Sequence, residues 1–137
     1  MRQINYIIIH CSATKAGQDF HASDIDRWHK ERGFDGIGYH RVIDLDGTIE
    51  KGRNVSKPGA HCKGYNFNSI GICYIGGLDK IGNPADTRTA AQKKSLLEIV
   101  KHYKMLYPNA KIVGHRDMPN VHKACPCFNA KEEYKNI

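Results

Sequence analysis

The apolar residues of this chain gather in short runs, separated by polar stretches rich in glycine. Two runs, residues 4–9 and 69–75, are almost unbroken and rich in β-branched residues, which is typical of strands buried on both faces. The dipeptide Asp46-Gly47 is a strong hairpin signal. Together with shorter apolar segments it predicts three further strands, at residues 39–43, 48–50 and 111–114.

Helical patterns alternate with these strands. Ser23 is the expected N-cap of a helix that ends at Gly33. Thr89 and Gln92 have the spacing of a capping box. A helical apolar stripe follows them, formed by Leu96, Leu97, Val100, Tyr103 and Leu106. A short terminal helix is expected at residues 130–136.

Strands mixed with helices, including a hairpin, predict an α/β fold with one mixed central β-sheet flanked by helices. The 137 residues fit a single domain spanning residues 1–137. Residues 51–68 contain turn-forming residues throughout and predict a long ordered loop, a length that usually serves function. Residues 79–88 are expected to form a second, polar loop.

Composition narrows the class of protein. A hydrophobic content of 40% and a charged content of 26% are those of an ordinary globular protein, and there is no apolar run long enough to span a membrane. No signal peptide is recognised, so we expect a cytoplasmic product that reaches an external substrate only after release. The net charge of +7 permits attraction to a polyanion, but the basic residues are scattered. We therefore do not expect nucleic acid as a partner. We also expect a monomer that does not insert into a membrane.

Metal-ligating residues follow two of the predicted strands. His10 follows the first strand and His115 the last, and Cys125 and Cys127 come shortly afterwards. Taken alone, His10 could equally be a buried core histidine. Two histidines and one thiol match a catalytic zinc site, which needs three protein ligands and leaves a fourth position open. Sequence chemistry does not separate the two cysteines. All five cysteines are expected to be reduced.

A zinc ion of this kind would lower the pKa of its bound water to roughly 7 and polarise a substrate carbonyl. The negative charge that develops on the carbonyl oxygen needs a donor or a cation nearby. Lys123 and Tyr39 are the candidates for this role. If they have no such role, Lys123 is a solvated lysine on the surface and Tyr39 is a half-buried aromatic residue of a strand.

Seven stretches give the chain a family resemblance. It resembles the zinc-dependent N-acetylmuramoyl-L-alanine amidases, which include the lysozymes of T-seven-like phages and the animal peptidoglycan recognition proteins. The matching stretches lie in the family's order and span almost the whole chain: Ile9-His10-Cys11-Ser12-Ala13-Thr14, Gly38-Tyr39-His40, Asp46-Gly47-Thr48, Lys63-Gly64-Tyr65-Asn66, Asn68-Ser69-Ile70-Gly71, Gly114-His115-Arg116-Asp117 and Lys123-Ala124-Cys125-Pro126.

The resemblance implies one zinc ion per chain in a surface groove, bound by His10, His115 and Cys125. It leaves Cys127 as an additional thiol. Tyr39 and Lys123 would then be catalytic. The implied substrate is peptidoglycan, and the implied reaction is hydrolysis of the amide between the lactyl group of N-acetylmuramic acid and L-alanine. As substrate-binding residues we expect His40, His61 and Tyr65.

Two other classes of function remain open. The first is a module that binds peptidoglycan without cutting it, as some relatives do. Such proteins typically lack the cysteine ligand, whereas Cys125 is present here. The second is a metal-free thiol hydrolase that uses Cys11 or Cys125 with a histidine. Chelators would distinguish it, since a thiol enzyme survives them.

Overall fold

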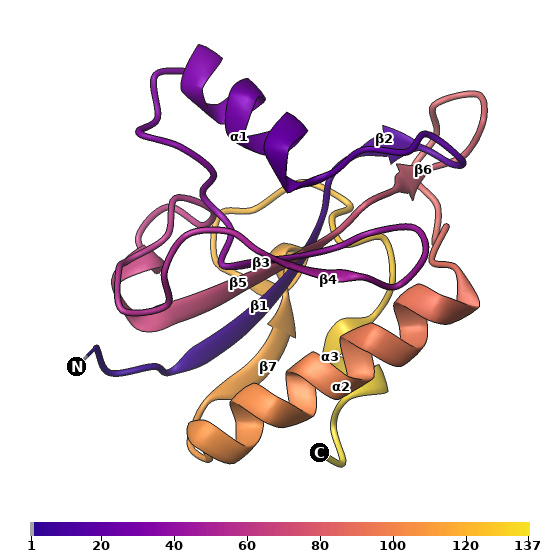
Figure 1. Ribbon diagram of the computed structural model, residues 1–137. Coiled ribbons are helices and arrows are strands. Elements are labelled where there is room, and N and C mark those ends of the chain that lie inside the picture. Colours follow the sequence, from indigo (N-terminus) through magenta and orange to yellow (C-terminus); the bar gives the residue numbers. More distant parts are fainter. Residues whose placement is uncertain (1) are drawn as a thin grey trace.

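A five-stranded mixed sheet forms the centre of the protein, as the sequence predicts (Figure 1). The computed structural model describes residues 2–137. The strand order is β4-β3-β5-β1-β7, and only the pairing of β3 with β4 is antiparallel. The strands are β1 (Tyr6–Cys11), β3 (Arg41–Ile43), β4 (Ile49–Lys51), β5 (Ser69–Tyr74) and β7 (Lys111–Gly114).

Two long helices cover opposite faces of this sheet (Figure 1). Helix α1 (Ala22–Glu31) packs Ile25 against Val42 of β3, and helix α2 (Ala90–Leu106) packs on the face that carries Ile43. Successive side chains of a strand point to opposite faces of the sheet, so one apolar strand contributes side chains to the core on both faces. This explains why β1 and β5 are almost continuously hydrophobic.

The strand boundaries differ slightly from the prediction. β1 extends through His10, so this histidine lies inside the strand and is 1% exposed. β3 begins at Arg41, so Tyr39 and His40 precede the strand. The loop at residues 51–68 is present and ends in a short 3-10 helix, η1 (Asn66–Asn68). Its length allows it to cross the sheet end beside His10.

Helix α2 begins as the sequence predicts. The Thr89 hydroxyl accepts the Gln92 backbone N–H at 3.0 Å, and the Gln92 side chain accepts the Thr89 N–H at 2.9 Å. Helix α1 begins earlier than predicted, with His21 rather than Ser23 as its N-cap. Two contacts fix this start: the Asp24 carboxylate accepts the His21 N–H at 2.9 Å, and the Glu50 carboxylate, distant in sequence, accepts the Ala22 N–H at 2.9 Å.

The remaining elements are short. A small parallel sheet of β2 (Thr14–Lys15) and β6 (Gly77–Leu78) was not predicted, because two-residue strands have no detectable periodicity. The terminal helix α3 (Ala130–Glu133) occupies only part of the predicted range, and η2 (His115–Asp117) follows β7. Among the described residues, no helix is long and apolar enough to cross a membrane.

Candidate metal centre

Two histidines and a cysteine meet where β1 and β7 end. The two strands are parallel neighbours, so their carboxyl ends lie at the same edge of the sheet. His10 is the penultimate residue of β1, and His115 directly follows β7. One donor atom from each of His10, His115 and Cys125 lies within 4.8 Å of the other two. The structure thus brings together the three residues that the family resemblance implies as ligands.

Cys125 is held in place by three backbone and side-chain contacts. The Tyr74 hydroxyl, from β5, donates to the Pro126 carbonyl at 2.6 Å, and the Arg116 N–H donates to the Cys125 carbonyl at 2.9 Å. The Cys11 N–H donates to the Cys125 sulfur at 3.2 Å. A donor aimed at sulfur stabilises the thiolate, which is the form that binds metals.

Cys127 lies outside this group. Its sulfur is 3.9 Å from the Cys11 sulfur, and burial raises its pKa to about 12. All five cysteines are free thiols. Sequence chemistry left the two cysteines as equal candidates for the third ligand, and the fold places only Cys125 beside the two histidines.

The environment keeps both histidines of the group neutral. Burial lowers the pKa of His10 well below its ordinary value, and the charges of His61, His115 and Lys123 lower it further. Burial, followed by the charge of Lys123, also lowers the pKa of His115. Only a neutral imidazole has a free nitrogen lone pair for a metal. At neutral pH both histidines are thus in the protonation state that a metal ligand requires.

His61 contacts the side of His10 that faces away from Cys125. Its Nδ1 lies 2.8 Å from His10 Nε2, and its Nε2 lies 3.2 Å from the Ser69 hydroxyl. Gly71 leaves space for this ring, since a Cβ atom there would lie 2.7 Å from it. The Asn66 side chain accepts the His61 N–H at 2.9 Å and fixes the loop. The sequence led us to expect His61 as a substrate contact, but it did not predict the contact with His10, because that contact depends on how the long loop packs.

Tyr39 stands beside the metal-ligating group. Its ring centroid is 5.0 Å from that of His10. Burial raises the pKa of Tyr39 well above its ordinary value, so the phenol remains protonated and can donate a hydrogen bond. Gly38, which precedes it, packs so tightly that a Cβ atom would overlap the Ala60 carbonyl. Glycine is therefore required for this approach of the backbone.

A groove of about 1360 Å³ opens above these residues. Its lining includes the three candidate ligands, Tyr39 and the exposed Lys123, together with His61 and Tyr65. Sequence reasoning missed the wall that the end of α1 supplies through His29, Arg32 and Phe34. The sequence predicts this helix from its ends alone, and it does not show that the helix borders a groove.

His40 does not line the groove. It is 1% exposed, its Nδ1 accepts the Gly71 N–H at 3.0 Å, and its Nε2 donates to the Lys57 carbonyl at 2.9 Å. Substrate contact through this side chain would require both bonds to break. The structure thus gives His40 a supporting position between the sheet and the long loop, in contrast to the expected contact with substrate.

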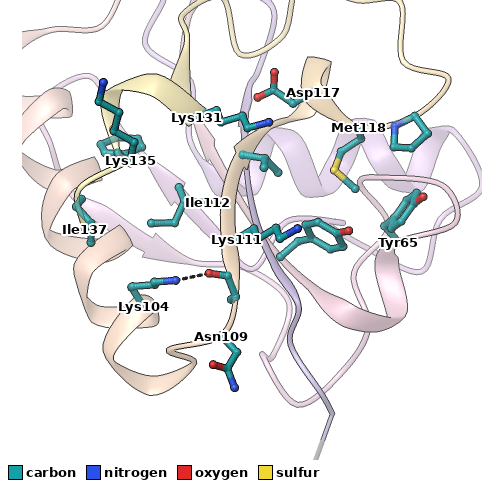
Figure 2. A pocket seen from close by; sticks show the side chains of 15 residues that line it. Tyr65, Lys104, Asn109, Lys111, Ile112, Asp117, Met118, Lys131, Lys135 and Ile137 are labelled. Carbon is teal, nitrogen blue, oxygen red and sulfur yellow. Dashed lines mark hydrogen bonds between the residues drawn. The ribbon is translucent and has the colours of Figure 1, made fainter.

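A second hollow, of about 510 Å³, lies along the outer edge of β7 (Figure 2). Figure 2 shows Lys104 of α2 reaching the Ala110 carbonyl, at 2.5 Å. Tyr65 borders both this hollow and the groove. The hollow includes none of the three candidate ligands.

Sequence comparison identifies relatives of known class. A family model described as N-acetylmuramoyl-L-alanine amidase matches residues 1–128. The endolysin of Klebsiella phage KP32 is 42% identical over 130 residues, which are 95% of this chain and 85% of the endolysin. The endolysin of Escherichia phage T7 is 42% identical over 125 residues, which are 91% of this chain and 82% of the relative.

Solved structures agree with these relatives. The N-acetylmuramoyl-L-alanine amidase LysC from Clostridium intestinale superposes with a TM-score of 0.80 at 30% identity, covering 96% of this chain and 82% of LysC. Drosophila PGRP-LB superposes with a TM-score of 0.80 at 26% identity, covering 99% of this chain and 82% of the other. The chain belongs to the N-acetylmuramoyl-L-alanine amidase family and is an amidase that acts on peptidoglycan.

Proposed function

We propose that the protein is a zinc-dependent amidase that cleaves the bond between the lactyl group of N-acetylmuramic acid and L-alanine. The observation that carries this proposal is the meeting of His10, His115 and Cys125 within 4.8 Å, beneath an open groove. Two imidazole nitrogens and one thiolate sulfur are ligands that zinc favours. Three protein ligands leave a position open on the groove side.

The donor set fits zinc in charge as well as in type. Zinc requires neutral histidines and a thiolate. Burial lowers the pKa of both histidines, and the Cys11 N–H donates to the Cys125 sulfur. When bound, zinc supplies Lewis acidity toward the substrate carbonyl and lowers the pKa of a water ligand. The remaining requirements of the reaction fall to side chains of the groove.

Tyr39 and Lys123 are the groups proposed to stabilise charge on the reacting carbonyl. The Tyr39 phenol is protonated and adjacent to His10, so it can donate to the oxygen as negative charge develops. The ammonium group of Lys123, on the rim, provides a positive charge near the same place. Tyr65 and His61 line the groove and are proposed to contact the substrate.

The reaction consumes one water molecule. The carbon–nitrogen bond of the amide breaks, the water oxygen remains in the new lactyl carboxylate, and the nitrogen leaves as the α-amino group of L-alanine. A proton must reach this nitrogen, and a solvent-accessible groove allows proton exchange with water.

Product analysis tests the proposal. Digestion of purified peptidoglycan should release stem peptides with a new amino-terminal L-alanine and leave glycan strands intact by mass spectrometry. New reducing sugar ends would indicate a glycosidase and would refute it. Binding without release of peptide would favour a recognition module. Activity that survives chelators but not thiol alkylation would favour a thiol hydrolase.

A further inference from the structure

A second group of potential metal-ligating side chains lies at the start of α1, and the groove wall is formed at the opposite end of this helix. It consists of His21 at the start of α1, Asp44 directly after β3 and Glu50 of β4. His21 Nδ1 lies 3.2 Å from an Asp44 oxygen and 3.5 Å from a Glu50 oxygen. One donor atom from each residue lies within 4.8 Å of the other two.

These separations match those of ligands around one ion. Nitrogen and oxygen ligands bind a divalent transition ion at about 2.0–2.2 Å, so neighbouring ligand atoms are roughly 3.0–3.5 Å apart in tetrahedral or octahedral geometry. Both distances from His21 Nδ1, 3.2 Å and 3.5 Å, are close to that range. An ion would therefore need little rearrangement of these side chains.

Asp44 provides an independent indication of a ligand. The residue is 4% exposed, and its Oδ1 has no hydrogen-bond partner, although its Oδ2 faces His21. A buried carboxylate is costly unless charge and hydrogen bonds compensate it. Here two carboxylates, Asp44 and Glu50, share a single imidazole. A cation bound by this group would neutralise both carboxylates.

The surroundings of the group resemble those of known metal ligands. His21 Nε2, the nitrogen that points away from the group, lies 3.4 Å from the Asp19 carboxylate. A metal-ligating histidine typically donates its second N–H to such a carboxylate. The Glu50 carboxylate is fixed by the Ala22 N–H at 2.9 Å. Both side chains are thus oriented before any ion arrives.

We propose that His21, Asp44 and Glu50 bind a second divalent ion, separate from the His10 centre. One imidazole and two carboxylates, without a thiol, suit Mn²⁺, which favours oxygen ligands. The His21 side chain is 45% exposed, which leaves coordination positions open to water. The bound ion would join the start of α1 to the β3–β4 hairpin.

The ion has a structural role in this proposal. Helix α1 carries His29 and is followed by Arg32 and Phe34, which form one wall of the groove. Fixing the other end of α1 to the sheet would hold that wall in place. The three proposed ligands lie outside the groove lining, so the ion would not contact substrate.

Manganese titration tests the site. Protein loaded with one equivalent of zinc should bind one Mn²⁺ per chain, measured by loss of the sharp electron paramagnetic resonance signal of aqueous Mn²⁺. Losing an outer partner of a ligand weakens metal affinity by about 10–100-fold, so Asp44→Asn and Glu50→Gln should each weaken it by about 100-fold or more. Glu98→Gln makes the same charge change on the exposed face of α2 and should bind Mn²⁺ normally.

Thermal unfolding provides a second readout. Mn²⁺ should raise the Tm of the wild type increasingly as its concentration exceeds the dissociation constant, whereas Glu50→Gln should need about 100-fold more Mn²⁺ for the same rise. Because Asp44 is buried, Asp44→Asn could fail to fold. In that case Glu50→Gln and His21→Gln test the site, and both should weaken Mn²⁺ binding. The proposal is overturned if no Mn²⁺ binds, or if all variants bind equally. Loss of Mn²⁺ binding in Cys125→Ser would also overturn it, by assigning the ion to the His10 centre.

Discussion

At the scale of single residues, we expect the contact between His61 and His10 to strengthen zinc binding at the proposed site. A side chain that hydrogen-bonds the other ring nitrogen of a metal-ligating histidine fixes its tautomer and ring orientation. We expect His61→Ala to weaken zinc binding by about 10–100-fold in a competition titration with a chromophoric chelator. His61→Asn, whose side chain can still reach His10, should recover much of the affinity. Equal affinity in all three proteins would contradict this role.

The two thiols next to Pro126 should differ completely in their effect on zinc. Cys125→Ser removes a proposed ligand and should abolish both zinc content and activity. Cys127→Ser should retain both, since this sulfur lies beside Cys11 and outside the group. Elemental analysis of purified variants is the measurement. Zinc retained by Cys125→Ser and lost by Cys127→Ser would reverse the assignment.

Tyr39 and Lys123 should affect turnover rather than metal content. Losing one group that stabilises a developing oxyanion typically costs about 10²–10³ in kcat, or roughly 2.7–4 kcal/mol. Tyr39→Phe and Lys123→Ala should therefore lower kcat and kcat/KM together, with zinc content unchanged. A raised KM with unchanged kcat in Lys123→Ala would instead assign this lysine to substrate binding.

The limits of sequence reasoning are clear at these residues. The positions of His10 and His115 could be predicted, because each comes at the end of an apolar run. Sequence could not show that His40 is enclosed by Gly71 and Lys57 while its neighbour Tyr39 faces the groove. That difference depends on how the long loop packs over the sheet.

At the scale of elements, the sequence predicted a helix start correctly where the capping contacts join residues close together in the chain. Thr89 and Gln92 cap α2 through bonds within four residues, and the prediction of this helix start is confirmed. The start of α1 was misplaced, and one of the two contacts that fix it comes from Glu50, which is distant in sequence. Strands β2 and β6 were missed because their pairing, and not their composition, defines them.

The cap of α2 has a predictable contribution to stability. Thr89→Ala removes the acceptor for the Gln92 N–H and the donor to the Leu45 carbonyl. We expect the free energy of unfolding to fall by about 1–2 kcal/mol in urea titrations. Thr89→Ser retains the hydroxyl and should remain close to the wild type. A loss as large in Thr89→Ser as in Thr89→Ala would show that the methyl group, and not the hydroxyl, matters.

At the scale of the whole molecule, the arrangement of β1 between β5 and β7 determines when the proposed zinc ligands can come together. β1 is formed by the first residues of the chain, and its partner β7 lies about a hundred residues later. We expect contacts so distant in sequence to form late, because closing the long loop between the two strands costs conformational entropy before their contacts can offset that cost. Zinc capture should therefore mark the end of folding. Chains stalled before β7 docks would have no site to fill, and a fluorescent zinc chelator could follow the last step of refolding in real time.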